Sequence, residues 1–195
     1  DFLDDFNRPD GDVGNGWATQ TDGTITVQIV DNEVLIAGTQ ATNWARCGIS
    51  RPVGDESIVS CDFMMPGGFN FHIRVDDADT DAYFEVYSWG GNLDHANSED
   101  GGWPGWVAIP GASPIADVYN SIVLELIGNE IAVTLNDTVV GTFTNAGLAN
   151  IGSVLIASDA AADTTGSLII DNVSLLSAGP PPAVHPATGE PLVID

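Results

Sequence analysis

Apolar and polar residues alternate along much of the chain, and this period of two limits the fold more than any other feature of the sequence. The alternation is clearest at 25–29, 59–65, 71–75, 122–126 and 131–135. Such a pattern is typical of β-strands that bury one face. No amphipathic helix of ten residues or more interrupts it, and turn-forming residues recur about every 8–12 residues. The sequence therefore predicts an all-β protein, an antiparallel sandwich of about 12 or 13 strands.

The length of 195 residues suits one sandwich rather than several domains. We expect the sandwich to occupy residues 1–178. Three consecutive prolines at 180–182 then predict a stiff linker within a Pro-rich C-terminal tail at 179–195. Residues 192–194 either add as a strand to a neighbouring chain, or belong to a frayed end or to the start of a further domain. The pattern leaves these alternatives open.

The net charge of −24 excludes one class of partner. The chain has 28 acidic residues, four arginines and no lysine. Nucleic-acid binding needs clustered basic side chains that displace counterions from phosphates, so it is not expected here. Docking on an anionic membrane is disfavoured for the same reason, and no run of about 18 apolar residues is present to span one. The chain begins at Asp1 without a signal peptide, which fits a processed product, a fragment or a mature secreted chain.

Motifs near both ends of the chain resemble a known family. Residues 4–11 (DDFNRPDG) and 14–17 (GNGW) are similar to the opening of concanavalin A-like jelly-roll domains of the laminin-G and laminarinase type. Residues 167–175 resemble the closing strand of these domains, and 131–138 resemble one of their hairpins. The resemblance implies a jelly-roll sandwich whose first and last strands pair. Such domains occur in bacteriophage minor tail and other virion proteins and in secreted carbohydrate-binding proteins, so fold alone does not give the function.

One hairpin can be placed from its turn residues. Asn136 and Asp137 both tolerate positive φ, so they predict a two-residue turn. This turn would place Val133 opposite Val140 on the neighbouring strand.

Outward side chains of the strands near 70–75 and 82–89 form a candidate sugar-binding face. A turn centred on 78–79 places His72 opposite Glu85. Sugars bind where aromatic rings stack on them and fixed polar groups form hydrogen bonds, and the long loop at 88–113 adds tryptophans. The candidate residues are His72, Arg74, Glu85, Tyr87, Trp89, Trp103 and Trp106. The alternative is ordinary cross-strand pairing, with the tryptophans holding their own loop in place.

Enzymatic activity is not expected from the sequence. A glycosidase needs two carboxylates about 5 to 9.5 Å apart. Glu85 and Glu125 are the possible pair, but the E-x-D-x-x-E run of laminarinase-type enzymes is missing. The three histidines, His72, His95 and His185, are scattered, and neither a Gly-x-Ser-x-Gly elbow nor an HExxH motif is present.

A structural Ca²⁺ is the one cofactor that the family resemblance implies. Jelly-roll relatives often hold this ion between the first and last strands. Asp171 shares its strand parity with Val173, which points it inward, and Asp4 or Asp5 could supply further oxygen ligands. The alternative is an ion pair between these carboxylates and Arg8.

The two cysteines are expected to be neighbours. A hairpin centred on Gly54 places Cys47 opposite Cys61, and both share the inward parity of their strands. Their Cβ atoms would then be close enough for a disulfide in an oxidising compartment. A buried pair of free thiols is the alternative in a cytosol.

The leading hypothesis from the sequence is a non-enzymatic structural module of a virion, such as a phage decoration, fibre or minor tail protein, that binds surface glycans. Its partners would be other virion or surface-assembly proteins, reached through the tail in an oligomeric assembly, at the virion surface or outside the cell. One alternative is a secreted carbohydrate-binding module, and a second is a divergent glycoside hydrolase. The sequence names neither the glycan nor the host.

Overall fold

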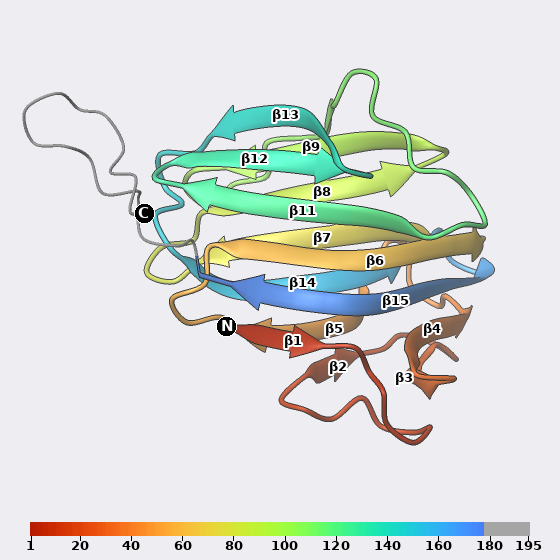
Figure 1. Cartoon of the computed structure of the whole chain (residues 1–195). Coiled ribbons are helices and arrows are strands. Elements are labelled where there is room, and N and C mark those ends of the chain that lie inside the picture. Colours follow the sequence, from red (N-terminus) through yellow and green to blue (C-terminus); the bar gives the residue numbers. More distant parts are fainter. Residues whose placement is uncertain (178–195) are drawn as a thin grey trace, which may run out of the picture.

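The computed structural model describes residues 1–177, which form fifteen strands in two antiparallel sheets packed face to face (Figure 1). Sheet A has the order β13 (Thr138–Thr144), β12 (Glu130–Leu135), β11 (Asn120–Ile127), β6 (Ile58–Gly67), β15 (Thr165–Leu176), β4 (Glu33–Thr39) and β3 (Thr26–Val30), and β1 (Phe2–Asp4) also pairs with β15. Sheet B has the order β10 (Val107–Ala108), β9 (Asn92–Ser98), β8 (Tyr83–Trp89), β7 (Asn70–Asp77), β14 (Ile151–Asp159), β5 (Cys47–Pro52) and β2 (Ala18–Gln20).

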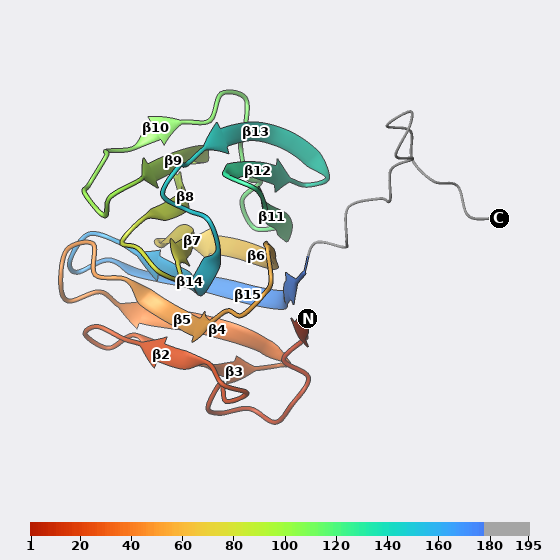
Figure 2. The same ribbon diagram turned by 90° about the vertical axis from the view of Figure 1, so that its left-hand side faces the viewer.

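This architecture confirms the predicted all-β jelly-roll sandwich. The strand count exceeds the expected 12 or 13 because β1, β2 and β10 are only two or three residues long, too short to show a period. The first and last described strands pair as expected, with Phe2 opposite Leu175. Figure 2 shows the two layers from the side, with the start of the chain beside the end of β15. The predicted tail at 179–195 lies outside the described residues.

The core fills the space between the sheets, and the inward positions are those that the alternation predicts. Phe71, Ile73 and Val75 of β7 and Phe84 of β8 are all buried in it. Phe63 of sheet A stacks on Phe71 of sheet B, with ring centroids 3.8 Å apart and planes 7° from parallel. The burial and stacking of these two rings stabilise the contact between the two layers. Because side chains alternate along a strand, these buried residues also determine which side chains of β7 and β8 lie on the outer face of sheet B.

The register of the β7–β8 hairpin differs from the prediction by two residues. His72 lies opposite Tyr87, and Arg74 lies opposite Glu85. A shift of two keeps every side chain on its predicted face, because the strand period is two. His72 and Glu85 are therefore diagonal neighbours on the outer face of sheet B rather than a directly opposed pair.

The predicted cysteine hairpin is wrong. Cys47 lies on β5 in sheet B and Cys61 lies on β6 in sheet A, so the two consecutive strands belong to different layers. Both thiols are free and buried. Burial raises the pKa of the Cys47 thiol to about 11 and raises that of Cys61 further, so both are unreactive thiols in the core.

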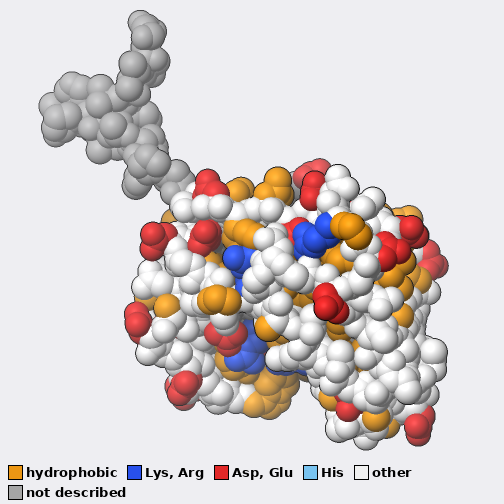
Figure 3. Space-filling view, turned by 90° about the horizontal axis from the view of Figure 1, so that it is seen from below, with side chains coloured by type: hydrophobic (Ala, Val, Ile, Leu, Met, Phe, Trp, Pro, Cys, Tyr) orange, Lys and Arg blue, Asp and Glu red, His pale blue; other side chains and the backbone are white. Residues whose placement is uncertain are grey.

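On one face of the molecule the acidic side chains are scattered rather than gathered (Figure 3). Figure 3 shows them as separate points on the lower face, with a few arginines lying between apolar side chains. Among the described residues there is no helix long and apolar enough to cross a membrane.

Candidate functional site

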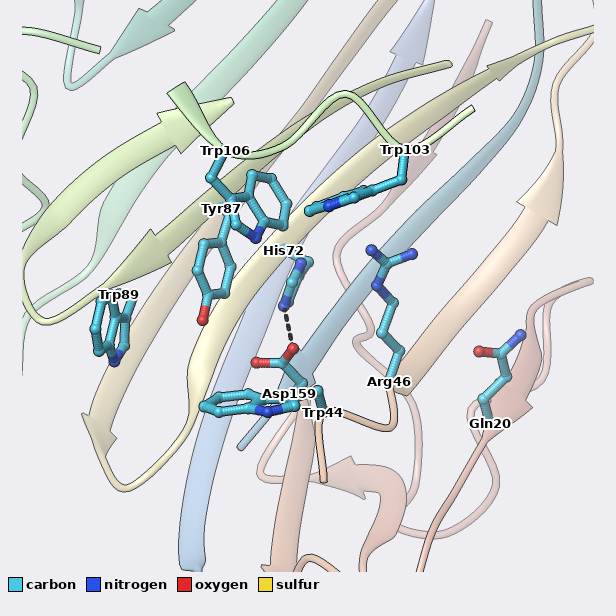
Figure 4. Close-up of a pocket in the computed structure, with 9 residues that line it drawn as sticks. All are labelled: Gln20, Trp44, Arg46, His72, Tyr87, Trp89, Trp103, Trp106 and Asp159. Carbon is cyan, nitrogen blue, oxygen red and sulfur yellow. Dashed lines mark ion pairs between the residues drawn. The ribbon is translucent and has the colours of Figure 1, made fainter. Parts of the chain in front are cut away.

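A cleft of about 770 Å³ opens on the outer face of sheet B (Figure 4). It is lined by Gln20, Trp44, Arg46, His72, Tyr87, Trp89, Trp103, Trp106 and Asp159. These residues come from β2, β7, β8 and β14 and from two loops. Four of the nine are tryptophans, and the remaining side chains include both signs of charge.

Tryptophans from three separate segments form the walls of the cleft. Trp103 and Trp106 belong to the loop between β9 and β10, and Trp106 stacks on Tyr87 with ring centroids 4.6 Å apart. Trp103 meets Trp106 edge to face at 5.1 Å. Trp89 ends β8, and Trp44 lies on the loop between β4 and β5. Trp44, Trp89 and Trp103 remain 53 to 60% exposed, an unusual cluster of bare aromatic surface around one cleft.

The backbone of Trp44 is strained where it presents its ring to the cleft. Its φ is +60°, a value that a bulky residue rarely adopts outside special sites. The loop holds this conformation through two bonds from the Gln40 side-chain amide, to the carbonyls of Thr42 and Ala45, and one from Trp44 N–H to the carbonyl of Ala160. Figure 4 shows the Trp44 ring beside Asp159, across the cleft from Trp103.

Ionic groups form the floor of the cleft. Nδ1 of His72 lies 2.7 Å from Oε1 of Glu85, and its Nε2 lies 3.0 Å from Oδ2 of Asp159. Arg46 donates to Oε2 of Glu85 at 2.8 Å. Asn70 donates to Oδ1 of Asp159, also at 2.8 Å. Of these groups His72, Arg46 and Asp159 line the cleft, and their side chains are 1%, 27% and 8% exposed, whereas the side chain of Glu85 is fully buried.

These contacts move the pKa values of the floor residues in opposite directions. Burial alone would lower the pKa of His72, but the two carboxylates raise it above its ordinary value of 6.5. Burial alone would raise the pKa of Asp159, but its contact with His72 and the bond from Asn70 lower it. The contacts therefore favour the charged pair, a protonated imidazole beside an ionised Asp159, more than it is favoured between the isolated side chains.

The structure brings most of the predicted sugar-binding residues together. His72, Tyr87, Trp89, Trp103 and Trp106 all line the cleft.

Two of the predicted residues do not line it. Glu85 is buried behind His72, and Arg74 points away, with its guanidinium 3.8 Å from the Tyr83 ring centroid and paired with Asp76. Glu85 was expected to face solvent, but its two carboxylate oxygens contact Arg46 and His72 and its side chain is fully buried.

Sequence reasoning missed Asp159, Trp44 and Gln20 as site residues. Asp159 ends a strand whose other residues are mostly apolar, and Trp44 and Gln20 stand in segments with no recognisable motif. Glu125, predicted as a possible partner of Glu85, is on β11 in sheet A, so the two belong to different layers.

The predicted calcium ligands do not converge. Asp4 is buried opposite Val173 and forms a two-pronged ion pair with Arg8, which is the alternative that the sequence left open. Asp171 points outward, because a β-bulge at Asn172 (φ +48°) reverses the strand parity on which the prediction depended. Asp5 is exposed. Within residues 1–177, no three His, Cys, Asp or Glu side chains are grouped to hold a metal ion.

We expect removal of divalent cations to leave the sandwich intact. The oxygens of Asp4 already accept bonds from protein donors, so a bound Ca²⁺ would have to displace them. Thermal unfolding followed by circular dichroism with and without excess EDTA should give melting temperatures that agree within about 1 °C. A clear fall in EDTA would instead support the calcium prediction.

Comparisons with known proteins support the fold through structure rather than sequence. No family model matches the chain, and no curated protein matches it significantly in sequence. Among solved structures, a Bacillus licheniformis β-glucanase has a TM-score of 0.70 and 12% identity, over 91% of this chain and 98% of its own. LamAcat from Zobellia galactanivorans has a TM-score of 0.65 and 13% identity, over 90% and 96%. A structure described as a sialidase matches 83% of this chain with a TM-score of 0.63 and 14% identity, but the match spans 17% of its own length.

These comparisons correct the functional prediction. The similar structures include glucanases, an endo-β-galactosidase and the Crh5 transglycosylase, and none of those reported is a phage protein. The hypothesis of a non-enzymatic virion module, and with it the expectation of no enzymatic activity, is therefore contradicted. The concanavalin A-like jelly-roll fold stands, as inferred from the motifs at the two ends of the chain.

Proposed function

We propose that this chain binds a glycan in the tryptophan-walled cleft and cleaves a glycosidic bond there, as a divergent glycoside hydrolase. The observation that carries the proposal is a single carboxylate, Asp159, held by His72 at the floor of an aromatic cleft. The fold it shares with glucanases and a transglycosylase gives independent support.

The walls suit a sugar chain. Pyranose rings present apolar C–H faces that pack on indoles, while their hydroxyls require hydrogen-bonding partners at the edge of the ring. Trp44, Trp89 and Trp103 offer exposed indoles, and Gln20 and Arg46 offer polar groups beside them. A cleft lined from several strands and two loops can hold more than one sugar ring.

The floor supplies the chemical group. Cleavage needs an acid that protonates the leaving oxygen and a carboxylate that stabilises the positive charge developing on the sugar. Oε1 of Glu85 and Oδ2 of Asp159 contact the two nitrogens of one imidazole ring, at 2.7 and 3.0 Å. A separation of one ring is compatible with the range of about 5 to 9.5 Å for glycosidase carboxyl pairs. Because Glu85 is buried and His72 fills the space between them, Asp159 is the group that can touch the sugar.

A carbohydrate-binding module is the second candidate, and one observation favours it. Both oxygens of Glu85 are already engaged, by His72 and by Arg46, so the pair lacks the second free carboxylate of an ordinary glycosidase. A module of this kind would bind glycans through the same tryptophans without cleaving them.

The test is a panel of soluble polysaccharides, assayed by calorimetry for binding and by release of reducing ends for cleavage. Binding with cleavage supports the hydrolase, and binding without cleavage supports the carbohydrate-binding module. Absence of both across a broad panel would contradict the glycan site itself.

The Trp44→Ala variant is expected to raise the Kd for a bound glycan about threefold to tenfold, because it removes one stacking surface. Trp44→Phe should retain much of the affinity. Val139→Ala is the matched control, since Val139 is similarly exposed but lies on sheet A. Equal affinities for Trp44→Ala and the unchanged chain would remove Trp44 from the binding site.

A further inference from the structure

Both ring nitrogens of His72 lie close to carboxylate oxygens. Nδ1 is hydrogen-bonded to Oε1 of Glu85 at 2.7 Å, and Nε2 lies 3.0 Å from Oδ2 of Asp159 as an ion pair that is not aligned as a hydrogen bond. A neutral imidazole carries one N–H, so it can donate to one of these groups and would turn a lone pair toward the other. With both carboxylates ionised, that arrangement is repulsive in a buried site. The array formed by His72, Glu85 and Asp159 therefore holds one proton more than a neutral histidine and two carboxylates would hold.

The surroundings decide where this proton can move. The guanidinium of Arg46 donates to Glu85 and already pairs with that carboxylate, so the proton is shared between His72 and Asp159. Two arrangements contain the same number of protons. In one, His72 is an imidazolium beside ionised Asp159. In the other, His72 is neutral with its proton on Nδ1, and Asp159 is protonated on Oδ2.

No further charged group is in contact with His72 among the described residues that face it. The Tyr87 ring lies 4.5 Å away and carries a hydroxyl that accepts a bond from Asn70. Burial, with Asp159 and Asp94 nearby, raises the pKa of Tyr87, so the hydroxyl stays neutral. Trp106 closes the remaining side, with ring centroids 6.0 Å apart. The array therefore titrates as one unit, and Asp159, with a side chain 8% exposed, is its most accessible member.

We propose that His72 stores the proton that Asp159 delivers to the glycosidic oxygen, which makes His72 a positioning and proton-holding residue; this rests on the proposed hydrolase function. The proton passes from Nε2 of His72 through Oδ2 of Asp159 to the glycosidic oxygen. The bond from this oxygen to the anomeric carbon breaks, and its electron pair stays on the oxygen. A water molecule then adds to the anomeric carbon, and the proton it releases returns through Asp159 to His72.

The first test is the pH dependence of kcat/KM. The unchanged chain should remain active above pH 6.5 and lose activity as the pH rises through the raised pKa of His72. In His72→Gln, an isolated Asp159 must supply the proton, so the alkaline limb should move down by at least about one pH unit, toward about pH 4. KM should change by less than about threefold, because the side chain of His72 is only 1% exposed in the cleft and offers the glycan little contact surface.

His95→Gln is the matched control. His95 is also buried, packed between the rings of Phe84 and Phe143, but within residues 1–177 no carboxylate forms an ion pair with it. Its substitution should leave the alkaline limb in place. If His72→Gln lowers kcat/KM equally at every pH and leaves the alkaline limb at the same pH, the role of His72 is structural alone and the proposal is overturned.

The second test needs no activity. Ring ¹⁵N and ¹³C shifts of His72, followed by NMR from pH 5 to 9 on the unchanged chain, should show an imidazolium that persists above pH 6.5. In Asp159→Asn the same resonance should titrate at a lower pH. A His72 ring that is already neutral at pH 6.5, or an unshifted titration in Asp159→Asn, would overturn the proton storage. Persistence of the imidazolium without any glycan cleavage would instead locate the failure in the proposed function.

Discussion

Asp159→Asn is expected to lower kcat/KM for glycan cleavage by about 10²- to 10⁴-fold, the usual effect of removing a positioned proton donor. Asparagine has the same shape, and its carbonyl oxygen can still accept the bond from Asn70. The amide cannot take up and release the proton that His72 holds. Most of the loss should appear in kcat, because the walls that bind the glycan are unchanged. The measurement is steady-state release of reducing ends on the substrate found with the polysaccharide panel.

Asp163→Asn provides the control. Asp163 is an exposed acid on the loop that follows β14, only four residues from Asp159, and its φ of +63° is one that asparagine tolerates. This variant should cleave at the rate of the unchanged chain. Retention of more than about a tenth of the activity in Asp159→Asn, with a normal melting temperature, would show that another group supplies the proton.

The faces of the strands could be predicted from the sequence, but their partners could not. Alternation places Ile73 and Val75 inward whatever the register, so the core and the outer face of sheet B follow from the period. Register depends on turns and bulges. A bulge after Val133 puts this residue opposite Gly141 rather than Val140, although Asn136 and Asp137 do form the expected positive-φ turn.

Pairings between distant segments explain what was missed. The prediction for Cys47 and Cys61 assumed that consecutive strands pair, but in this topology β5 pairs with β14 and β2, and β6 pairs with β11 and β15. The same β14 pairs with β7, which brings Asp159 beside His72 from 87 positions along the chain. No local sequence pattern predicts a contact between such distant residues. Tyr87 and Trp89 were predicted as site residues because the alternation along their own strand places both on the outward face.

The contacts of Asp4 explain the structural role of the opening motif on which the family resemblance depends. Its carboxylate is 3% exposed and accepts bonds from the side chains of Arg8, Asn15 and Trp17 and from the backbone of Phe6. The donors are part of the opening motif, so the motif encodes a clamp that folds the N-terminal segment around one buried charge. These bonds lower the pKa of Asp4 although burial alone would raise it.

Asp4→Ala is expected to reduce the free energy of unfolding by about 3 kcal/mol, at the low end for a broken buried ion pair because Arg8 is partly exposed. For a domain of this size the melting temperature should fall by roughly 6 to 12 °C. Urea unfolding followed by tryptophan fluorescence measures the change directly. Asp5→Ala is the control. Asp5 is exposed and accepts one long bond, from the backbone N–H of Asn7, so this substitution should cost less than about 0.5 kcal/mol.

The pH dependence of this stabilisation separates the lost charge from lost packing. A carboxylate whose pKa is lowered by folding stabilises the protein above its unfolded pKa of about 4, and this contribution disappears as the pH falls through the folded value. The difference in stability between the unchanged chain and Asp4→Ala should therefore be full at pH 7 and should shrink below about pH 4. A difference that stays constant down to pH 2 would mean that Asp4 acts through shape alone, and that the ion pair with Arg8 contributes nothing to holding β1 on β15.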